Sequence, residues 1–107
     1  VIDRNRLQIS GNTEDVMGHD DLHERIRSFG WHVIDVKDGN SVEEIYDAIA
    51  KAYETKGVPT CLILNTVKGK GATFAEPSGA HSSQPSKEEW DEGIAAVEAA
   101  YEAIKKA

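Results

Sequence analysis

Cysteine is scarce in this sequence and long apolar runs are missing, and both absences limit what the protein is. Cys61 is the only cysteine among 107 residues, so no disulfide forms within the chain. It lies in the apolar run TCLILN, which is typical of a small buried residue rather than of a nucleophile. No apolar run approaches the roughly 18 residues of a membrane span, and no signal peptide opens the chain. We therefore expect a cytoplasmic protein with no membrane partner.

Positive charge is also in short supply. Twelve Lys and Arg stand against 19 Asp and Glu, which gives a formal net charge of −7. This balance argues against nucleic acid as a partner, because phosphate backbones attract basic surfaces. It does not exclude a small phosphorylated ligand, since local donors can bind an anion on an acidic protein. The remaining composition, 39% hydrophobic and 29% charged, is ordinary for one globular domain.

The apolar segments predict an α/β fold with a parallel sheet and flanking helices. We expect strands at residues 1–3, 32–36 and 60–66, and helices from about Asp20 to Phe29, after Ser41 and after Ser86. The third strand is a continuous apolar run, as expected where both faces of a strand are covered. Alternation of strands and helices implies right-handed crossovers between parallel strands.

Three strands make a thin sheet, and the first one starts at Val1 without an initiator Met. A strand at this position needs neighbours on both sides. We therefore expect residues 1–107 to be the C-terminal portion of a larger domain, with a start that is cut rather than natural.

Capping signals mark the ends of the expected helices. Ser41 with Glu44, and Ser86 with Glu89, each form an S-x-x-E pattern that predicts a capping box. Gly30 is placed to end the first helix. The last helix carries apolar residues at helical spacing, which predicts a buried stripe: Trp90, Ile94, Val97, Tyr101 and Ile104.

Two long irregular segments follow the first and third strands, at residues 4–19 and 68–85. In open α/β sheets, ligands bind beyond the carboxyl ends of the strands. Long loops inside a compact domain are uncommon and often functional. These two segments are therefore where we expect a binding site.

The first segment opens with the stretch DRNRLQ. Asp3 and Asn5 are two residues apart at a strand end, so their side chains leave the same face. The Asn5 oxygen, with a backbone carbonyl at Leu7, would suit a hard cation such as Mg²⁺, which takes oxygen ligands and shares them with phosphates. The alternative is an Asx-turn that merely ends the strand.

The second segment reads KGKGATFAEPSGAHSSQP. Lys68 and Lys70 add positive charge, while Gly69 and Gly71 permit close backbone approach, but the spacing of a phosphate-binding Walker loop is absent. The alternative is a solvated turn with surface lysines. His81 lies among small residues outside any regular element, so it is either a functional histidine or surface decoration.

The remaining histidines carry weaker signals. His19 and His23 are four residues apart at the start of the first helix, which is the spacing of a metal pair. No third ligand accompanies them, so helix-surface positions are the simpler interpretation. His32 opens a strand and is expected to be structural.

Taken in order, the stretches VIDRNRLQISG, FGWHVIDV and LILNTVKGKGATF, followed by a His and a Pro, resemble the thiamine-diphosphate-binding domain of transketolases. The resemblance covers nearly all of the 107 residues but only the second half of that domain. It is greatest to the N-terminal chains of split bacterial or archaeal transketolases, in which this domain is a separate polypeptide.

The resemblance implies roles for individual residues. Asn5 resembles the residue that binds both Mg²⁺ and thiamine diphosphate, and Leu7 the residue whose carbonyl completes the protein ligands. His81 resembles the histidine that contacts cofactor and sugar and assists carbon–carbon cleavage. Lys68 and Gly69 match positions at which the chain of family members passes the cofactor. The resemblance implies no catalytic role for either residue.

The resemblance also implies an activity and an assembly. A two-carbon ketol unit would pass from a ketose phosphate to an aldose phosphate, with a C-terminal transketolase subunit or domain as partner. A homodimer or heterotetramer is implied. A 1-deoxyxylulose-5-phosphate synthase-like enzyme and a non-catalytic assembly piece are the alternatives.

The sequence departs from the family pattern in several places. HSSQP replaces the usual residues after the histidine, Ser10 stands where many members have Asp, and no G-D-G motif supplies the aspartate ligand. Asp3 does not substitute for that aspartate in the family pattern. We therefore expect weak or no cofactor binding, and no turnover, from residues 1–107 alone.

Overall fold

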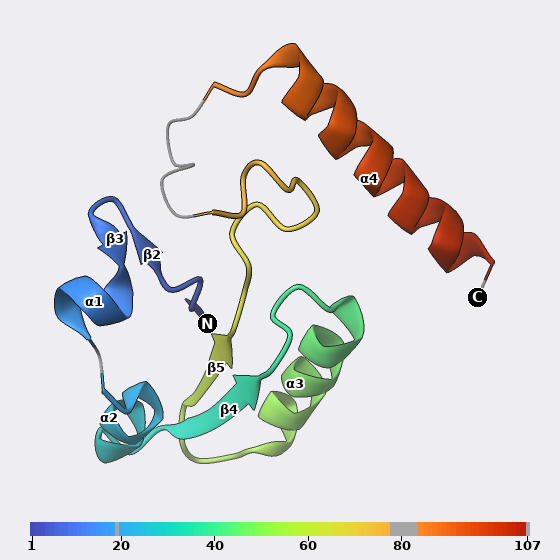
Figure 1. Cartoon of the computed structure of the whole chain (residues 1–107). Coiled ribbons are helices and arrows are strands. Elements are labelled where there is room, and N and C mark those ends of the chain that lie inside the picture. Colours follow the sequence, from blue (N-terminus) through green and yellow to red (C-terminus); the bar gives the residue numbers. More distant parts are fainter. Residues whose placement is uncertain (19, 78–83, 107) are drawn as a thin grey trace. The chain divides into compact units, whose positions relative to one another are not determined.

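A parallel three-stranded sheet forms the framework of the N-terminal part of the chain. In the computed structural model, which describes residues 1–18, 20–77 and 84–106, the strands pair in the order β1-β5-β4. These strands are β1 (Ile2–Asp3), β4 (His32–Val36) and β5 (Thr60–Leu64). Figure 1 shows β4 and β5 side by side in this sheet. The register aligns Ile2 with Ile63 and Val36 with Leu64, so all three strands end at one edge. The expected parallel α/β sheet is confirmed.

The chain forms two compact units, Val1–Val67 and Lys68–Ala107. The sheet and the helices that cover it belong to the first unit. The described residues of the second unit include one long helix, near the end of the chain.

One face of the sheet packs against α3 (Val42–Glu54) and forms the hydrophobic core. Val36, Ala48 and Leu62 are buried there, and partly buried apolar side chains surround them: Ile34, Ile45, Ala52 and Leu64. Because side chains alternate along a strand, Cys61 and Ile63 point to the opposite face, where both are buried. The expected burial of Cys61 is confirmed.

The opposite face of the sheet is next to α2 (Leu22–Ser28), and Figure 1 shows β4 between α2 and α3. Asp35 points toward α2, where its carboxylate lies 2.7 Å from Nε2 of His23. The side chain of Asp21 caps α2 by accepting a hydrogen bond from the Glu24 N–H, and this bond lowers the pKa of Asp21. Gly30 ends α2 as expected, with its N–H donating to the Arg27 carbonyl at 2.8 Å.

The two predicted capping boxes differ in the structure. At α4 (Lys87–Lys105) the box is complete, because Ser86 Oγ accepts from the Glu89 N–H and Glu89 accepts from the Ser86 N–H. At α3 only the first of these bonds forms. The Glu44 carboxylate instead accepts from the Asp38 N–H at 3.0 Å, so the prediction of a full box there is wrong.

Residues 4–19 contain more regular structure than the sequence predicts. β2 (Leu7–Gln8) and β3 (Gly11–Asn12) form an antiparallel hairpin, and α1 (Thr13–Met17) follows at once. These elements are too short to leave a periodic hydrophobic pattern, and none of the α1 residues is buried.

The second unit contains the turns of residues 68–77 and α4. Phe74 packs edge-on against Trp90 of α4, with ring centroids 5.2 Å apart. The predicted burial of the apolar stripe of α4 is wrong, because within the described residues each of its five side chains is more than half exposed. In the part of the chain that the structure describes, no helix is both long and apolar enough to cross a membrane.

Candidate functional site

Polar side chains link the strands of the first unit where those strands end. The hydroxyl of Thr66, two residues beyond β5, donates to the carboxylate of Asp3 at the end of β1. On the β4 side, the Gly39 N–H donates to the Asn65 carbonyl at 2.9 Å. The Asn40 side chain accepts from the Val67 N–H at 2.8 Å. The carboxyl edge of the sheet, where α/β folds bind ligands, is thus held in a fixed arrangement.

Asn5 and Leu7 are brought together in a tight turn just beyond β1. The Leu7 N–H donates to Asn5 Oδ1 at 2.9 Å, which is an Asx-turn. Arg6 between them has a φ of 60°, in the left-handed region that side chains with a Cβ rarely adopt. The Thr13 N–H donates to the Arg6 carbonyl at 2.9 Å and holds this backbone in place. Unfavourable backbone of this kind occurs often at binding sites.

A cavity of about 260 Å³ opens beside the turn. Residues 2–7 line it, together with Thr13 and Leu22. The Arg4 guanidinium is mostly buried here and bonds to the Glu14 carboxylate at 3.2 Å. The residues that line the cavity thus include two arginines, Arg4 and Arg6, together with the Asn5 amide and the Asp3 carboxylate. This set of groups suits a phosphorylated ligand.

The donor set of the turn fits Mg²⁺ in part. Asn5 Oδ1 has a second lone pair besides the one that Leu7 uses, and the backbone carbonyls of the turn are further oxygen donors. The described residues contain no cluster of three or more His, Cys, Asp or Glu that could hold a metal ion. The turn thus offers neutral oxygen ligands, and the Asp3 carboxylate, which lines the same cavity, accepts a hydrogen bond from Thr66.

A second polar cluster lies between α2 and the sheet. Asp35 accepts from the Asn65 amide at 2.9 Å and is bonded to His23, whose other ring nitrogen lies 3.6 Å from Asp21. Burial raises the pKa of Asp35, but the hydrogen bonds to His23 and Asn65 outweigh burial and leave that pKa below its ordinary value. His23 therefore holds α2 against β4, and this structural contact explains the histidine without a metal. His19 lies outside the described residues.

Lys68 and Gly69 belong to the second unit. Gly69 has a φ of 72°, and a Cβ there would lie 2.6 Å from the Ala75 carbonyl oxygen, so the turn requires a glycine. The Gly71 N–H donates to the Glu76 carboxylate at 3.0 Å. His81 lies outside the described residues. Of the five residues predicted for the site, the structure brings Asn5 and Leu7 together.

Sequence reasoning missed the polar residues that follow β5. Asn65 and Thr66 connect β5 to β4 and β1, yet the sequence prediction counted both as strand residues. The sequence did contain a signal for Asn65 and Thr66. Polar side chains directly after a buried apolar strand lie at the edge of the sheet where α/β proteins form their sites. The left-handed backbone of Arg6 had no such signal, since arginine has no preference for it.

Comparisons with known proteins identify what the chain is similar to. A family model described as "Transketolase, thiamine diphosphate binding domain" matches residues 1–102. The chain is 37% identical over 97 residues to the 6-deoxy-6-sulfo-D-fructose transketolase subunit SqwG of Clostridium sp.. It is 36% identical over 107 residues to an apulose-4-phosphate transketolase subunit of Phocaeicola vulgatus. A transketolase of Nostoc sp. is 41% identical over 73 residues, which cover 67% of this chain and 11% of the Nostoc protein.

The chain spans only part of these relatives. The match to the Clostridium subunit covers 90% of this chain and 35% of that subunit. The match to the Phocaeicola subunit covers 99% of this chain and 38% of that subunit. Most of each relative thus lies beyond the matched region.

Proposed function

The chain belongs to the transketolase family, and we propose that it supplies one part of a transketolase active site that works with thiamine diphosphate and Mg²⁺. The reaction moves a two-carbon ketol unit from a ketose phosphate to an aldose phosphate. The observation that carries this proposal is the match of residues 1–102 to the thiamine diphosphate binding domain. The position of the Asn5 turn at the carboxyl edge of a parallel sheet supports it.

The Asn5 turn is the proposed site for the metal and the diphosphate. Asn5 Oδ1 and the Leu7 carbonyl act as oxygen ligands of Mg²⁺, which commonly shares its ligands with phosphates. The guanidinium of Arg4, which lines the same cavity, adds positive charge for an anion. In this proposal an additional carboxylate ligand comes from a part of the protein that residues 1–107 do not include, since the matches cover 35% and 38% of these relatives.

The protein's own chemical role falls to His81. Thiamine diphosphate, when bound, supplies the nucleophilic carbon that breaks and remakes the bond next to the sugar carbonyl. A histidine beside the sugar exchanges a hydroxyl proton, because its ordinary pKa lies near neutrality. Lys68 and Gly69 are proposed to border the cofactor without a catalytic role.

The partner in this proposal is a C-terminal transketolase subunit or domain, within a homodimer or heterotetramer. The relatives whose names include the word subunit support a partner subunit. Their names also give two different sugars, one with a sulfo group and one with a phosphate. We propose an acidic end group as the shared feature of the sugar, here a phosphate.

Calorimetric titration tests the proposal. Thiamine diphosphate with Mg²⁺ is titrated into two samples. The first is residues 1–107 alone. The second is a complex of the C-terminal subunit with a longer chain that includes the upstream part found in the relatives. We expect saturable binding and ketol transfer only in the second sample. Condensation of pyruvate with glyceraldehyde 3-phosphate would favour the synthase instead, and absence of binding in both samples would favour a non-catalytic assembly piece.

Two substitutions in the assembled protein separate the roles of the residues. Asn5→Ala is expected to weaken Mg²⁺-dependent cofactor binding first, whereas His81→Ala lowers turnover far more than cofactor affinity. Asn12→Ala is the matched control. The amide of Asn12 is exposed and donates to the Asp15 carboxylate at 3.0 Å. The reverse pattern for Asn5 and His81 would contradict these assignments.

A further inference from the structure

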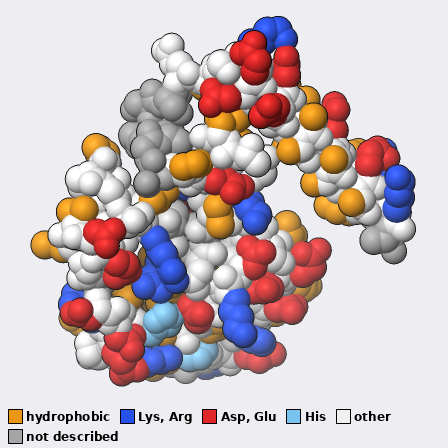
Figure 2. Space-filling view, in the orientation of Figure 1, with side chains coloured by type: hydrophobic (Ala, Val, Ile, Leu, Met, Phe, Trp, Pro, Cys, Tyr) orange, Lys and Arg blue, Asp and Glu red, His pale blue; other side chains and the backbone are white. Residues whose placement is uncertain are grey.

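The helix α4 presents an apolar face that nothing in the described part of the second unit covers. Its apolar residues follow intervals of four and three, the spacing by which one helix packs along another. Their exposed fractions are 53%, 53%, 52%, 57% and 75% for Trp90, Ile94, Val97, Tyr101 and Ile104 respectively. Figure 2 shows hydrophobic side chains at the surface along this helix. We call these five residues the α4 stripe.

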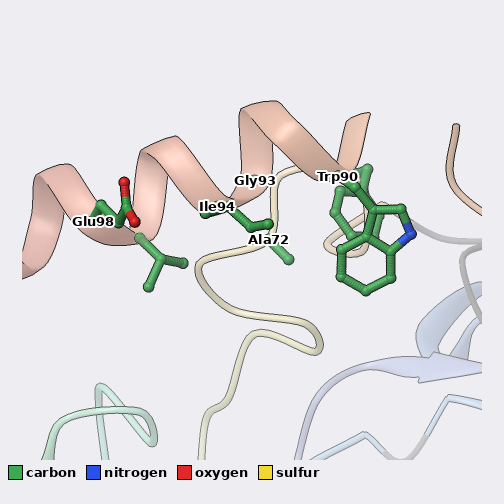
Figure 3. A pocket seen from close by; sticks show the side chains of 7 residues that line it. Ala72, Trp90, Gly93, Ile94 and Glu98 are labelled. Atoms are coloured by element: carbon green, nitrogen blue, oxygen red, sulfur yellow. The ribbon is translucent and has the colours of Figure 1, made fainter. Parts of the chain in front are cut away.

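A cavity of about 230 Å³ lies along the N-terminal half of the α4 stripe, from Trp90 to Val97. Figure 3 shows Trp90 and Ile94 projecting from α4 toward the turn that contains Ala72. The Phe74 ring closes one side, and Gly93 makes room for it, since a Cβ there would lie 3.0 Å from that ring. A preformed apolar hollow of this size accepts one large side chain of a partner, as at the centre of many interfaces.

The charges beside the α4 stripe indicate what kind of partner fits. No Lys or Arg occurs between Glu88 and Ile104, whereas the same segment contains six acidic residues: Glu88, Glu89, Asp91, Glu92, Glu98 and Glu102. Asp91 and Glu98 directly follow stripe residues and therefore form one edge of the apolar face. A second copy of α4 would bring a similar acidic segment, with basic residues only at its ends. A helix with Lys or Arg beside its own apolar stripe is complementary instead.

We propose that the α4 stripe and its cavity form the docking surface for an amphipathic, basic-edged helix of the C-terminal transketolase subunit. The identity of the partner rests on the proposed function, because relatives that match this chain are named as transketolase subunits. An apolar side chain of that helix fills the cavity that Phe74, Trp90 and Ile94 line. Its Lys or Arg residues face Glu98, because Asp91 is already paired with Lys87 at 2.5 Å.

Trp90 provides a direct signal for this contact. The chain has two tryptophans, so Trp31→Phe leaves Trp90 as the only one. This variant, in the longer chain that includes the upstream part of the relatives, is titrated with the C-terminal subunit of the same organism. We expect the emission of Trp90 to shift to the blue and its quenching by acrylamide to fall, because docking removes the ring from water.

Substitutions on two faces of α4 localise the contact. Ile94→Asp is expected to weaken subunit binding at least tenfold, whereas Ala99→Asp, with the same charge on the opposite face, changes it less than twofold. Glu98→Lys is expected to weaken binding several-fold, and the difference from the unchanged chain shrinks in high salt. Glu98→Lys alters only an exposed side chain, so it tests the proposal even if Ile94→Asp disturbs α4.

The outcomes separate this proposal from the proposed function. Subunit binding that depends on Ile94 supports the docking surface even if no cofactor binds to the complex. Cofactor binding in a complex that tolerates Ile94→Asp and Glu98→Lys would overturn the docking surface alone. It would also be overturned if Trp90 were already shielded in the longer chain, or if the chain paired with itself through α4 in sedimentation.

Discussion

Single residues at the carboxyl edge of the sheet determine the shape of the candidate site. Arg6 adopts a φ of 60° although it has a Cβ, and its carbonyl is held by the Thr13 N–H. A non-glycine residue in this conformation costs about 1–2 kcal/mol. The hairpin and α1 that follow compensate for that cost and keep Asn5 and Leu7 in one turn. The Asx-turn and a metal-binding turn are therefore compatible, since Asn5 Oδ1 can accept from Leu7 and still present a lone pair.

Asp35 leads to a prediction about pH. Its carboxyl has an ordinary pKa of 3.8 when the chain is unfolded, and the hydrogen bonds to His23 and Asn65 keep the folded value lower despite partial burial. A group whose pKa is lower in the folded state stabilises the fold fully above pH 3.8. That stabilisation is lost as the pH falls through the folded pKa. The nearby charged groups are Arg4, which also favours the ionised form, and Asp21 on the far side of His23.

We expect Asp35→Asn to lower the free energy of unfolding at pH 6 by less than about 1 kcal/mol, because the site is partly exposed and screened. The difference from the unchanged chain should vanish near pH 2. Urea unfolding at both pH values measures it. Asp47→Asn on α3 is a control with the same change of charge. An equal difference at the two pH values would show that ionisation of Asp35 does not stabilise the fold.

Gly39 leads to a prediction about packing. A Cβ at this position would lie 2.8 Å from Thr66 Cγ2 and 2.9 Å from the Leu64 backbone. Because backbone atoms cannot move aside easily, we expect Gly39→Ala to destabilise the fold by about 1–3 kcal/mol in chemical unfolding.

Gly57 provides the contrast for this prediction. It has a φ of 79°, and a Cβ there would meet no atom within 4 Å. Gly57→Ala should therefore cost about 1 kcal/mol through backbone strain alone, and Gly57→Asn should recover part of that loss. Gly39→Asn should recover none. Recovery by asparagine at position 39 would mean that backbone strain, rather than crowding, explains the glycine.

Helices with strong local signals were predictable, and short elements were not. Both serines with an S-x-x-E pattern cap their helices, because this signal is local and does not depend on tertiary contacts. At α3, however, Glu44 bonds to the Asp38 N–H instead of closing the box. The sequence pattern cannot distinguish two nearby donors. The β2–β3 hairpin and α1 escaped prediction because elements this short show no hydrophobic periodicity.

Ser86 leads to a prediction at the scale of α4. Its side chain accepts from the Glu89 N–H at 3.2 Å, and its own N–H donates to the Glu89 carboxylate at 2.8 Å. We expect Ser86→Ala to destabilise the first turn of α4 by about 1 kcal/mol and to speed amide exchange there roughly fivefold. Ser86→Asp should retain the cap. Unchanged exchange in Ser86→Ala would show that the first turn is fixed by other contacts.

For the molecule as a whole, the resemblance to transketolases seen in the sequence is confirmed by the family match over residues 1–102. The sequence predicted the order of the long elements because each of them has its own apolar pattern, which is periodic in the helices and continuous in β5. It predicted a buried face on α4 for the same reason, yet periodicity shows only that a face is apolar and not what covers it. Trp90 and Tyr101 remain more than half exposed in the structure. The cavity that Phe74 and Trp90 line depends on contacts between a turn and α4, which no local pattern encodes.

This exposed face leads to a prediction about how stability is distributed along the chain. Residues in β5 and α3 enclose the buried core, and Ile63 is completely buried. In α4, by contrast, Gly93 is the one buried residue of the helix, and an isolated helix of this length is only marginally stable in water. Amide hydrogen exchange of residues 1–107, followed by mass spectrometry, should therefore be at least tenfold faster in α4 than in β5.

Adding the C-terminal subunit to the longer chain should slow exchange in α4 and leave exchange in β5 nearly unchanged, because β5 is already protected by the core. The same measurement on Ile94→Asp should show fast exchange in α4 with or without the subunit. Ala99→Asp should behave like the unchanged chain. Protection of α4 equal to that of β5 in residues 1–107 alone would mean that the apolar face is already covered within this chain, and the exposed stripe would then not be available to a partner.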